Sequence, residues 1–216
     1  MNGLLISFEG PAGCGKSTQV TILADRLKAR GRTVHLVREP GGTPIGEEIR
    51  FTLKHSPENH AMTWEAELLL MNASRAQLVR EIIRPALAAG EVVICDRYYD
   101  STTAYQGYGR GLDLALVKAI IDFAIGETRP DLTLFLELPL SVSEARLASR
   151  QATMPFVRDR MEEADRAFFE RVARGYRAIA NAEPGRIKVI DAAASLGTVS
   201  AAIWRQIECL IGPANS

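Results

Sequence analysis

A glycine-rich stretch near the start of the chain ends in a lysine and two hydroxyl residues. Residues 9–19 read EGPAGCGKSTQ, which fits the pattern G-x-x-x-x-G-K-S with Gly10, Gly15, Lys16 and Ser17. Glycines let successive backbone N–H groups turn toward one anion, and a following helix adds about half a positive charge at its N-terminus. The lysine can reach the outer phosphates of a nucleotide, and the serine can bind Mg²⁺. The stretch predicts a phosphate-binding loop rather than a glycine turn without a ligand.

We expect this loop to contact ATP along its whole length. Its variable positions carry no basic side chain, so the loop offers main-chain N–H groups and a single lysine. Any further positive charge on the transferred group must therefore come from elsewhere in the chain. The ATP-binding residues predicted here are Gly10, Pro11, Ala12, Gly13, Cys14, Gly15, Lys16, Ser17 and Thr18.

A second polar group follows the apolar run VVIC, where Asp96 and Arg97 stand side by side. A guanidinium can fork onto phosphate oxygens, and the carboxylate can orient that arginine or hold Mg²⁺ through water. Transfer of a phosphoryl group between two anions needs such charge neutralisation and in-line positioning. Without this context an Asp–Arg pair is more often a surface ion pair. We predict that Arg97 binds a phosphate group and that Ser17 and Asp96 are the Mg²⁺ ligands.

The elements that position these residues are short apolar runs that alternate with helical patterns. This alternation is typical of an α/β fold in which helices cover a parallel sheet. Ligands of such sheets bind beyond the carboxyl ends of the strands, which is where both polar groups occur. Because the runs are almost continuously apolar, we expect strands that are buried on both faces. Strands are predicted at residues 4–8, 33–37, 92–95, 132–138 and 187–190.

Helices are predicted where apolar residues recur three and four positions apart. The residues Val20, Leu23, Ala24 and Leu27 follow this spacing, and Gly31 ends the pattern. The same spacing predicts a helix within residues 65–88 and another over 199–210. Residues 39–62 and 150–162 fit less well and are expected to form loops or short helices.

Composition excludes several classes of protein. The 216 residues are 47% hydrophobic, which suits one domain with its own core. Lys+Arg and Asp+Glu are both 26, so no basic field is available to bind a nucleic-acid polymer. The three cysteines lack CxxC spacing, which favours reduced thiols and a cytoplasmic protein. No run approaches the roughly 18 apolar residues of a membrane span. The N-K-x-D motif of GTPases is also absent from the sequence.

The remaining motifs resemble those of the thymidylate kinases. The resemblance covers nearly the whole chain, from FEGPAGCGKSTQ through REPGGTPIGEEIR, LLLMNASRAQLV, CDRYYDSTTAYQGYGRG and PDLTLFLEL to DRMEEADRAFFERVARGY. It implies transfer of the γ-phosphoryl group of ATP to dTMP, which gives dTDP and ADP in dTTP synthesis. The implied fold is a P-loop NTPase-type three-layer sandwich with a five-stranded parallel sheet in the order 2-3-1-4-5. One nucleoside-monophosphate-kinase-like domain would span residues 1–216, with its P-loop at 10–17, and the family suggests a homodimer.

The same resemblance assigns residues to the acceptor nucleotide. Glu9 would meet the acceptor sugar and its metal-bound water, or it is simply a buried carboxylate at a strand end. Arg75 would donate to the O4 edge of thymine. Because arginine only donates hydrogen bonds, it would face the amino group of cytosine donor to donor, which disfavours CMP. The predicted acceptor-binding residues are Glu9, Pro40, Arg50, Met71, Arg75, Arg97, Thr102, Tyr105 and Gln106.

A group of arginines resembles the LID of bacterial members of the family, at about residues 146–162. Arg146 would contact ATP, while one of Arg150, Arg158 and Arg160 would act on the transferred group in cis. A charge run of this kind is otherwise a solvated face. An arginine of this type contributes about 10³ to 10⁵ in rate, so one of the three should dominate. The predicted catalytic residues are Glu9, Lys16, Asp96, Arg97, Arg150, Arg158 and Arg160.

The sequence departs from the family at Met71, where relatives commonly carry a phenylalanine that stacks on thymine. A methionine contact on an aromatic ring is weaker than aromatic stacking on a base. This residue is either part of the base pocket or ordinary core. Two alternatives therefore stay open, namely a kinase for another acceptor such as dUMP and an ATP-binding relative without turnover.

Overall fold

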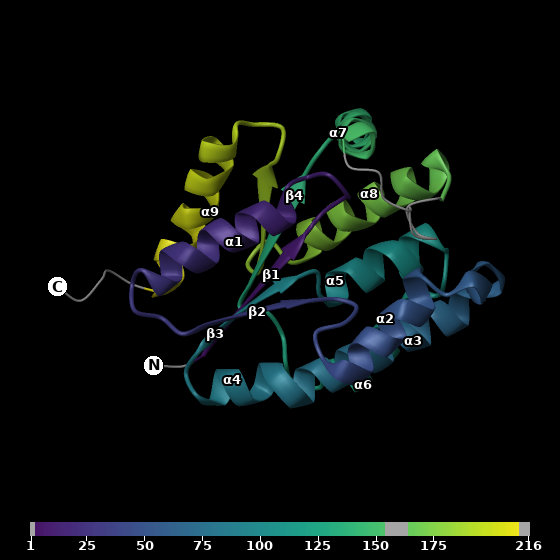
Figure 1. The fold of residues 1–216 in the computed structure, drawn as a ribbon, viewed down its shortest axis with the longest axis horizontal. Helices are drawn as coiled ribbons and strands as arrows, with labels where there is room; N and C mark the ends of the chain where they lie inside the picture. The colour runs from purple at the N-terminus through teal and green to yellow at the C-terminus, as the bar shows by residue number, and fades with distance from the viewer. Residues whose placement is uncertain (1–2, 154–163, 212–216) are drawn as a thin grey trace.

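The computed structural model of the chain describes residues 3–153 and 164–211 (Figure 1). Its centre is a parallel sheet in the strand order β2-β3-β1-β4-β5, which confirms the predicted topology. All five strands lie where the apolar runs predicted them. They are β1 (Leu4–Glu9), β2 (Val34–Arg38), β3 (Val92–Asp96), β4 (Leu132–Glu137) and β5 (Ile187–Asp191).

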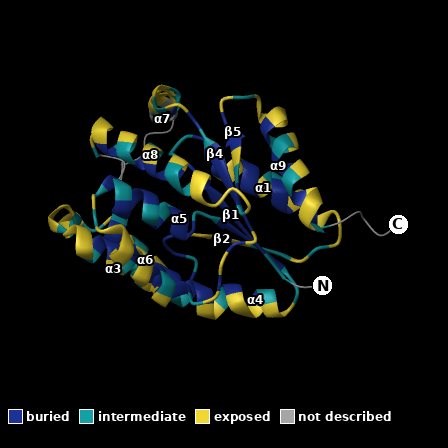
Figure 2. Ribbon diagram, turned by 180° about the vertical axis from the view of Figure 1, so that it is seen from behind, coloured by how far each residue is buried: buried dark blue, intermediate teal, exposed yellow. Residues whose placement is uncertain are grey.

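Helices cover both faces of the sheet, which gives the three layers (Figures 1 and 2). Alternate residues of β1 point to opposite faces. Ile6 and Phe8 pack in one core with α1 (Lys16–Lys28) and α9 (Leu196–Ile211). Leu5 packs in a second core with α3 (Trp64–Leu78) and α6 (Leu114–Ile125).

Burial of the strands depends on their place in the sheet. The central strands β3, β1 and β4 are buried along almost their whole length, as predicted. The two edge strands are not, since Leu36 of β2 is 45% exposed and Val189 of β5 is 51% exposed. The prediction of two buried faces is therefore wrong for β2 and β5. Their apolar sequences resemble those of the central strands, and only the position at the edge exposes them.

The predicted helices are present, and residues 39–62 contain more helix than expected. The pattern within 65–88 forms α3, a π-helical turn η2 (Val79–Ile83) and α4 (Arg84–Ala88) in succession. Residues 39–62 hold the 11-residue helix α2 (Pro44–Lys54) and the short η1 (Pro57–Ala61). Ile45 and Phe51 of α2 are more than half exposed, so its apolar residues do not mark one buried face. Of residues 150–162, those after α7 (Leu140–Thr153) lie outside the described residues.

The helical segment that follows β3 in the chain packs closely against another helix. The short α5 (Tyr99–Thr102) continues into a π-helix, η3 (Thr103–Gly109), which packs against α8 (Arg166–Ala182). A Cβ atom on Gly175 of α8 would lie 2.8 Å from the ring of Tyr108. Only glycine allows this approach, and the approach fixes the position of the next residue, Tyr176. None of the helices in the described part of the chain has both the length and the apolar character of a bilayer-spanning helix.

Candidate active site

The predicted phosphate loop lies between β1 and α1. Gly10, Gly13 and Gly15 all have positive φ, at 139°, 74° and 91°. A Cβ atom on Gly10 would lie 2.5 Å from the carbonyl oxygen of Leu136, so this position also excludes larger residues. Since α1 begins at Lys16, the unpaired N–H groups of its first turn belong to the loop. The loop thus has the backbone of an anion-binding site.

Lys16 is the buried cation of this loop. Its side chain is folded back, and Nζ donates to the carbonyl oxygens of Gly10 at 3.0 Å and Pro11 at 2.8 Å. Burial lowers the pKa of Lys16, and the nearby charge of Arg97 lowers it further. A buried ammonium group without a negative partner is unfavourable. Phosphate oxygens bound at this loop would supply that partner.

The two predicted Mg²⁺ ligands lie next to each other. Ser17 Oγ donates to Asp96 Oδ2 at 2.7 Å, although the residues are 79 positions apart in the chain. A hydroxyl and a carboxylate are oxygen ligands, and Mg²⁺ usually takes few of these from a protein and the rest from water and phosphates. The pair therefore fits Mg²⁺. No group of three or more His, Cys, Asp or Glu side chains that could hold a metal by itself occurs among the described residues.

Arg97 lies at the end of β3 with a left-handed backbone, φ 71°, which is unusual for a residue other than glycine. Its N–H donates to the carbonyl oxygen of Phe8 on the neighbouring strand at 2.9 Å. Nη1 donates to Ser101 Oγ at 3.1 Å and to the hydroxyl of Tyr176 at 3.2 Å. Nη2 donates to the hydroxyl of Tyr105 at 3.4 Å. The guanidinium therefore points into the protein at the strand end and not into bulk solvent.

Glu9, at the end of β1, shares these hydroxyl groups. It is fully buried, and Oε2 accepts from Ser101 Oγ at 2.5 Å and from the hydroxyl of Tyr176 at 3.0 Å. Oε1 accepts from the backbone N–H of Tyr98 at 2.8 Å. Burial raises the pKa of Glu9 to about 7, and the charge of Asp100 adds to the shift. Glu9 can therefore gain or lose a proton near neutral pH.

A cavity of about 80 Å³ opens beside Arg97 and has the polar and apolar walls of a nucleotide site. Most of the predicted acceptor residues line it, from α3, α5, η3 and the segments that follow β2 and β3. Neither Glu9 nor Arg50, both predicted to bind the acceptor, is part of its wall. Arg50 Nη1 donates to the carbonyl oxygen of Pro40 at 2.8 Å. The predicted residues that line the cavity are Pro40, Met71, Arg75, Arg97, Thr102, Tyr105 and Gln106.

Arg75 is fixed in this wall by a buried carboxylate. Nε and Nη2 both donate to Glu39 Oε2, at 2.8 and 2.6 Å, and Nη1 donates to Asn72 Oδ1 at 2.8 Å. Nη2 also donates to the carbonyl oxygen of Tyr98 at 3.4 Å, so these bonds use four of the five N–H groups of an arginine. One N–H on Nη1 is left for a ligand. Glu39 Oε1 is buried without a hydrogen-bond partner among the described residues, and burial raises the pKa of Glu39 against the effect of Arg75.

Gln106 is oriented by another buried carboxylate. Its Nε2 donates at 2.8 Å to Oε1 of Glu67, which is itself fully buried and paired with Arg110. An ionised carboxylate accepts hydrogen bonds and cannot donate them. The amide nitrogen must therefore face Glu67, and the amide oxygen is the atom left for a ligand. Gln106 and Arg75 together therefore offer one acceptor and one donor to this cavity.

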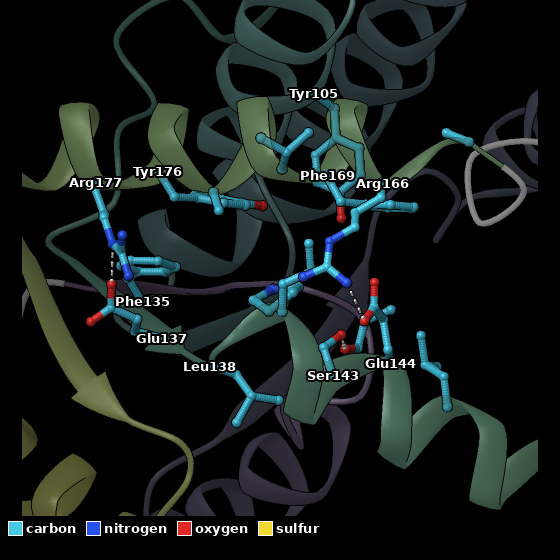
Figure 3. Close-up of a pocket in the computed structure, with 17 residues that line it drawn as sticks. Tyr105, Phe135, Glu137, Leu138, Ser143, Glu144, Arg166, Phe169, Tyr176 and Arg177 are labelled. Carbon is cyan, nitrogen blue, oxygen red and sulfur yellow. Dashed lines mark hydrogen bonds and ion pairs between the residues drawn. The ribbon is translucent and has the colours of Figure 1, made fainter.

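A larger cavity of about 200 Å³ lies between α7 and α8 (Figure 3). Its wall is mainly aromatic and aliphatic, with Phe135, Phe169 and Tyr176 among its residues. It shares Ala12, Tyr105 and Phe169 with the smaller cavity, and it lacks Arg75 and Arg97. We therefore take the smaller cavity as the acceptor site.

The predicted LID arginines are only partly described. Arg146 of α7 donates to the carbonyl oxygens of Gly13 at 3.4 Å and Ala192 at 3.1 Å, which sets it against the phosphate loop. Arg150 belongs to α7, but its side chain is outside the described part of the structure. Arg158 and Arg160 lie outside the described residues altogether.

Sequence reasoning missed several residues of this site. Glu39, Ser101 and Phe169 line the acceptor cavity, and Tyr176 and Glu67 lie behind it. The first three occur inside motifs that are easily seen, but nothing in their local spacing distinguishes them from core or surface residues. Their roles depend on contacts between distant elements.

Comparison with known proteins identifies relatives along most of the chain. The family model described as thymidylate kinase matches residues 8–203. The thymidylate kinase of Pseudomonas syringae pv. syringae (strain B728a) is 48% identical over 203 residues, which is 94% of each chain. That of Syntrophotalea carbinolica is 49% identical over 200 residues, or 92% of each chain. A crystal structure of thymidylate kinase from Ehrlichia chaffeensis superposes with a TM-score of 0.77 at 31% identity, covering 96% of this chain and 100% of the other.

Proposed function

Because the chain belongs to the thymidylate kinase family, its reaction is the ATP-dependent phosphorylation of dTMP to dTDP, and we propose how its residues divide this reaction. The donor half is the loop of residues 10–17 with Arg146, and it binds the phosphates of ATP. The acceptor half is the smaller cavity with Arg97, and it binds dTMP. One observation carries this proposal: the 2.7 Å contact between Ser17 and Asp96 joins the two halves at the strand ends.

Ser17 and Asp96 are the residues that would hold Mg²⁺. A Mg²⁺ ion held there would supply positive charge to offset the negative charge that develops during transfer. Cationic side chains of the protein supply the rest of the positive charge. Lys16 leaves the loop carbonyls for the outer phosphates of ATP, and an arginine from the LID, at about residues 146–162, closes over the transferred group.

The acceptor phosphate binds to Arg97, and Arg50 would assist. Arg50 already reaches the carbonyl oxygen of Pro40 at the wall of the cavity. Glu9 accepts hydrogen bonds from the hydroxyl groups of Ser101 and Tyr176 beside Arg97 and would act on the acceptor through them. In-line attack by a dTMP phosphate oxygen on the γ-phosphorus of ATP then needs no covalent intermediate on the protein.

The base is read by a donor and an acceptor at the far end of the cavity. The remaining N–H of Arg75 donates to thymine O4, and the amide oxygen of Gln106 accepts from thymine N3–H. Cytosine carries an acceptor at N3 and a donor at N4, so both contacts would be lost and buried groups would stay unpaired. This arrangement supports dTMP over dCMP as the acceptor.

A coupled assay of ADP release with dTMP, dUMP, CMP, AMP, GMP and thymidine tests the proposal. We expect the highest kcat/KM with dTMP, a lower value with dUMP, which lacks the methyl group, and little ADP with the other nucleotides. Thymidine offers no phosphate to accept the γ-phosphoryl group and should give none. ADP release that is independent of every acceptor, or greatest with CMP, would contradict the assignment.

We propose further that one domain spans residues 1–216, that the protein is cytoplasmic and that it forms a homodimer. All three cysteines are free thiols, which favours a reducing compartment. The dimer is supported by exposed apolar side chains on the packed pair α3 and α6, since Leu69 is 56%, Leu116 54% and Phe123 84% exposed. Analytical ultracentrifugation of the purified chain tests the dimer directly.

A further inference from the structure

Two hydroxyl groups separate the Arg97 guanidinium from the Glu9 carboxylate. Both N–H groups of Nη1 are used, one donating to Ser101 Oγ at 3.1 Å and the other to the hydroxyl of Tyr176 at 3.2 Å. Each hydroxyl in turn donates to Glu9 Oε2, at 2.5 Å from Ser101 and 3.0 Å from Tyr176. The cation and the anion are thus joined through two parallel bridges.

Arg97, Ser101, Tyr176 and Glu9 form a ring of hydrogen bonds in which every proton of Nη1 and of the two hydroxyls has an acceptor. A hydroxyl has one proton to donate and lone pairs with which to accept. With Glu9 ionised, each hydroxyl can give its proton to Oε2 and accept one N–H from Arg97, and the two hydroxyl oxygens also lie 2.9 Å apart, within hydrogen-bond distance of each other. Burial and the nearby Glu9 charge raise the pKa of Tyr176, so its phenol keeps the proton that this arrangement needs.

Tyr176 is held in place by aromatic packing (Figure 3). Its ring stacks on Phe135, with centroids 5.0 Å apart and planes 18° from parallel. It also meets Tyr105 edge to face at 6.3 Å. The side chain is buried, at 3% exposure, and the neighbouring Gly175 brings α8 close to η3. The hydroxyl therefore has little freedom to leave the ring of hydrogen bonds.

We propose that Tyr176 is a positioning residue that, together with Ser101, aims Arg97 at the acceptor phosphate. The inference rests on the proposed function of Arg97. The two bridges occupy Nη1, and Tyr105 takes one N–H of Nη2 at 3.4 Å. Nε and the second N–H of Nη2 have no partner among the described residues. These two N–H groups form one edge of the guanidinium, which is the edge that forks onto two phosphate oxygens.

Tyr176 reaches this site from a distant part of the chain. It lies on α8, 167 residues beyond Glu9, and its ring lines the larger cavity rather than the acceptor cavity. It therefore acts on the acceptor phosphate through Arg97, without a place in the wall that dTMP contacts.

The test compares the affinities of Tyr176→Phe and wild type for dTMP and for thymidine, by isothermal titration calorimetry. Thymidine occupies the base and sugar site but lacks the phosphate that Arg97 binds. We expect dTMP to bind about tenfold more weakly to the variant, and thymidine to bind within about twofold of wild type. A defect in folding or in the base pocket would weaken both ligands.

Tyr108→Phe is the matched control, because Tyr108 packs on the same helix at Gly175 and has no place in the site. It should change neither affinity. Ser101→Ala should repeat the selective loss of dTMP affinity, which keeps the test decisive if Tyr176→Phe does not fold. Equal weakening of both ligands, or no weakening, would overturn the role of Tyr176 while leaving the reaction intact. If wild type bound dTMP no better than thymidine, the phosphate role of Arg97 would fail as well.

Discussion

The donor and acceptor halves of the site are built in different ways. The donor half is one continuous loop of residues 10–17, and its main ligands are backbone N–H groups whose directions are fixed by glycines with positive φ. The acceptor half uses side chains from β1, β3, α3 and η3. Two of its polar side chains are held by buried carboxylates, Arg75 by Glu39 and Gln106 by Glu67.

This difference follows from what each half must distinguish. Phosphate groups are alike, so a loop of main-chain donors is sufficient to bind them. Thymine must be told apart from cytosine, which requires a donor and an acceptor in fixed positions. Long side chains keep fixed positions only when their own hydrogen bonds are satisfied. The acceptor half should therefore be more sensitive to substitutions outside the contact surface.

The largest expected effect is at Lys16 in the donor half. Lys16→Ala should lower kcat by about 10³-fold, because the cation for the outer phosphates is removed. If the two halves are separate, calorimetry should give a dTMP affinity within about twofold of wild type. An equally large loss of dTMP affinity would show that the halves are not independent, and kcat close to wild type would remove Lys16 from the mechanism.

A smaller effect is expected at Glu39, which holds Arg75 in the wall of the acceptor cavity. Glu39→Gln should raise the KM for dTMP about tenfold and lower the free energy of unfolding by about 3 kcal/mol, since it leaves a buried guanidinium without its counter-charge. The ion pair is almost fully buried, with side chains 2% and 4% exposed. Urea unfolding and steady-state kinetics measure the two effects.

Glu47→Gln is the matched control for Glu39, because Glu47 pairs with Arg38 on the surface at 44% and 49% exposure. Solvent screens such a pair, so the change in unfolding free energy should stay under about 1 kcal/mol. Similar losses in the two variants would contradict the claim that burial makes the supporting residues critical.

The smallest expected effect is a change in base discrimination at Glu67. Glu67→Gln should lower the ratio of kcat/KM for dTMP to that for dCMP about tenfold. A neutral amide can donate as well as accept hydrogen bonds, so the side-chain amide of Gln106 could rotate and present its nitrogen to the base. Glu65→Gln, at an exposed position of the same helix, should leave the ratio unchanged. An unchanged ratio in Glu67→Gln would mean that Gln106 is oriented by other contacts.

Local sequence was sufficient for the parts of the protein with local signals. The five apolar runs predicted the strands, and the glycine pattern predicted the loop that joins β1 to α1. The end of β3 was also identified, and Asp96 does meet Ser17 there. By contrast, the length of α2 was missed; its apolar residues are split between solvent and core, since Ile45 and Phe51 are exposed and Leu53 is buried.

The sequence by itself therefore determined the parallel sheet, the phosphate loop and the residue types at the strand ends, because these depend on spacing within a few residues. Only the tertiary structure decided which carboxylates hold Arg75 and Gln106, which strands lie at the edges, and that Tyr176 of α8 reaches Glu9 and Arg97. Those contacts join residues far apart in the chain. The contacts of Tyr176 depend on the close packing of α8 on η3, which no short-range pattern encodes.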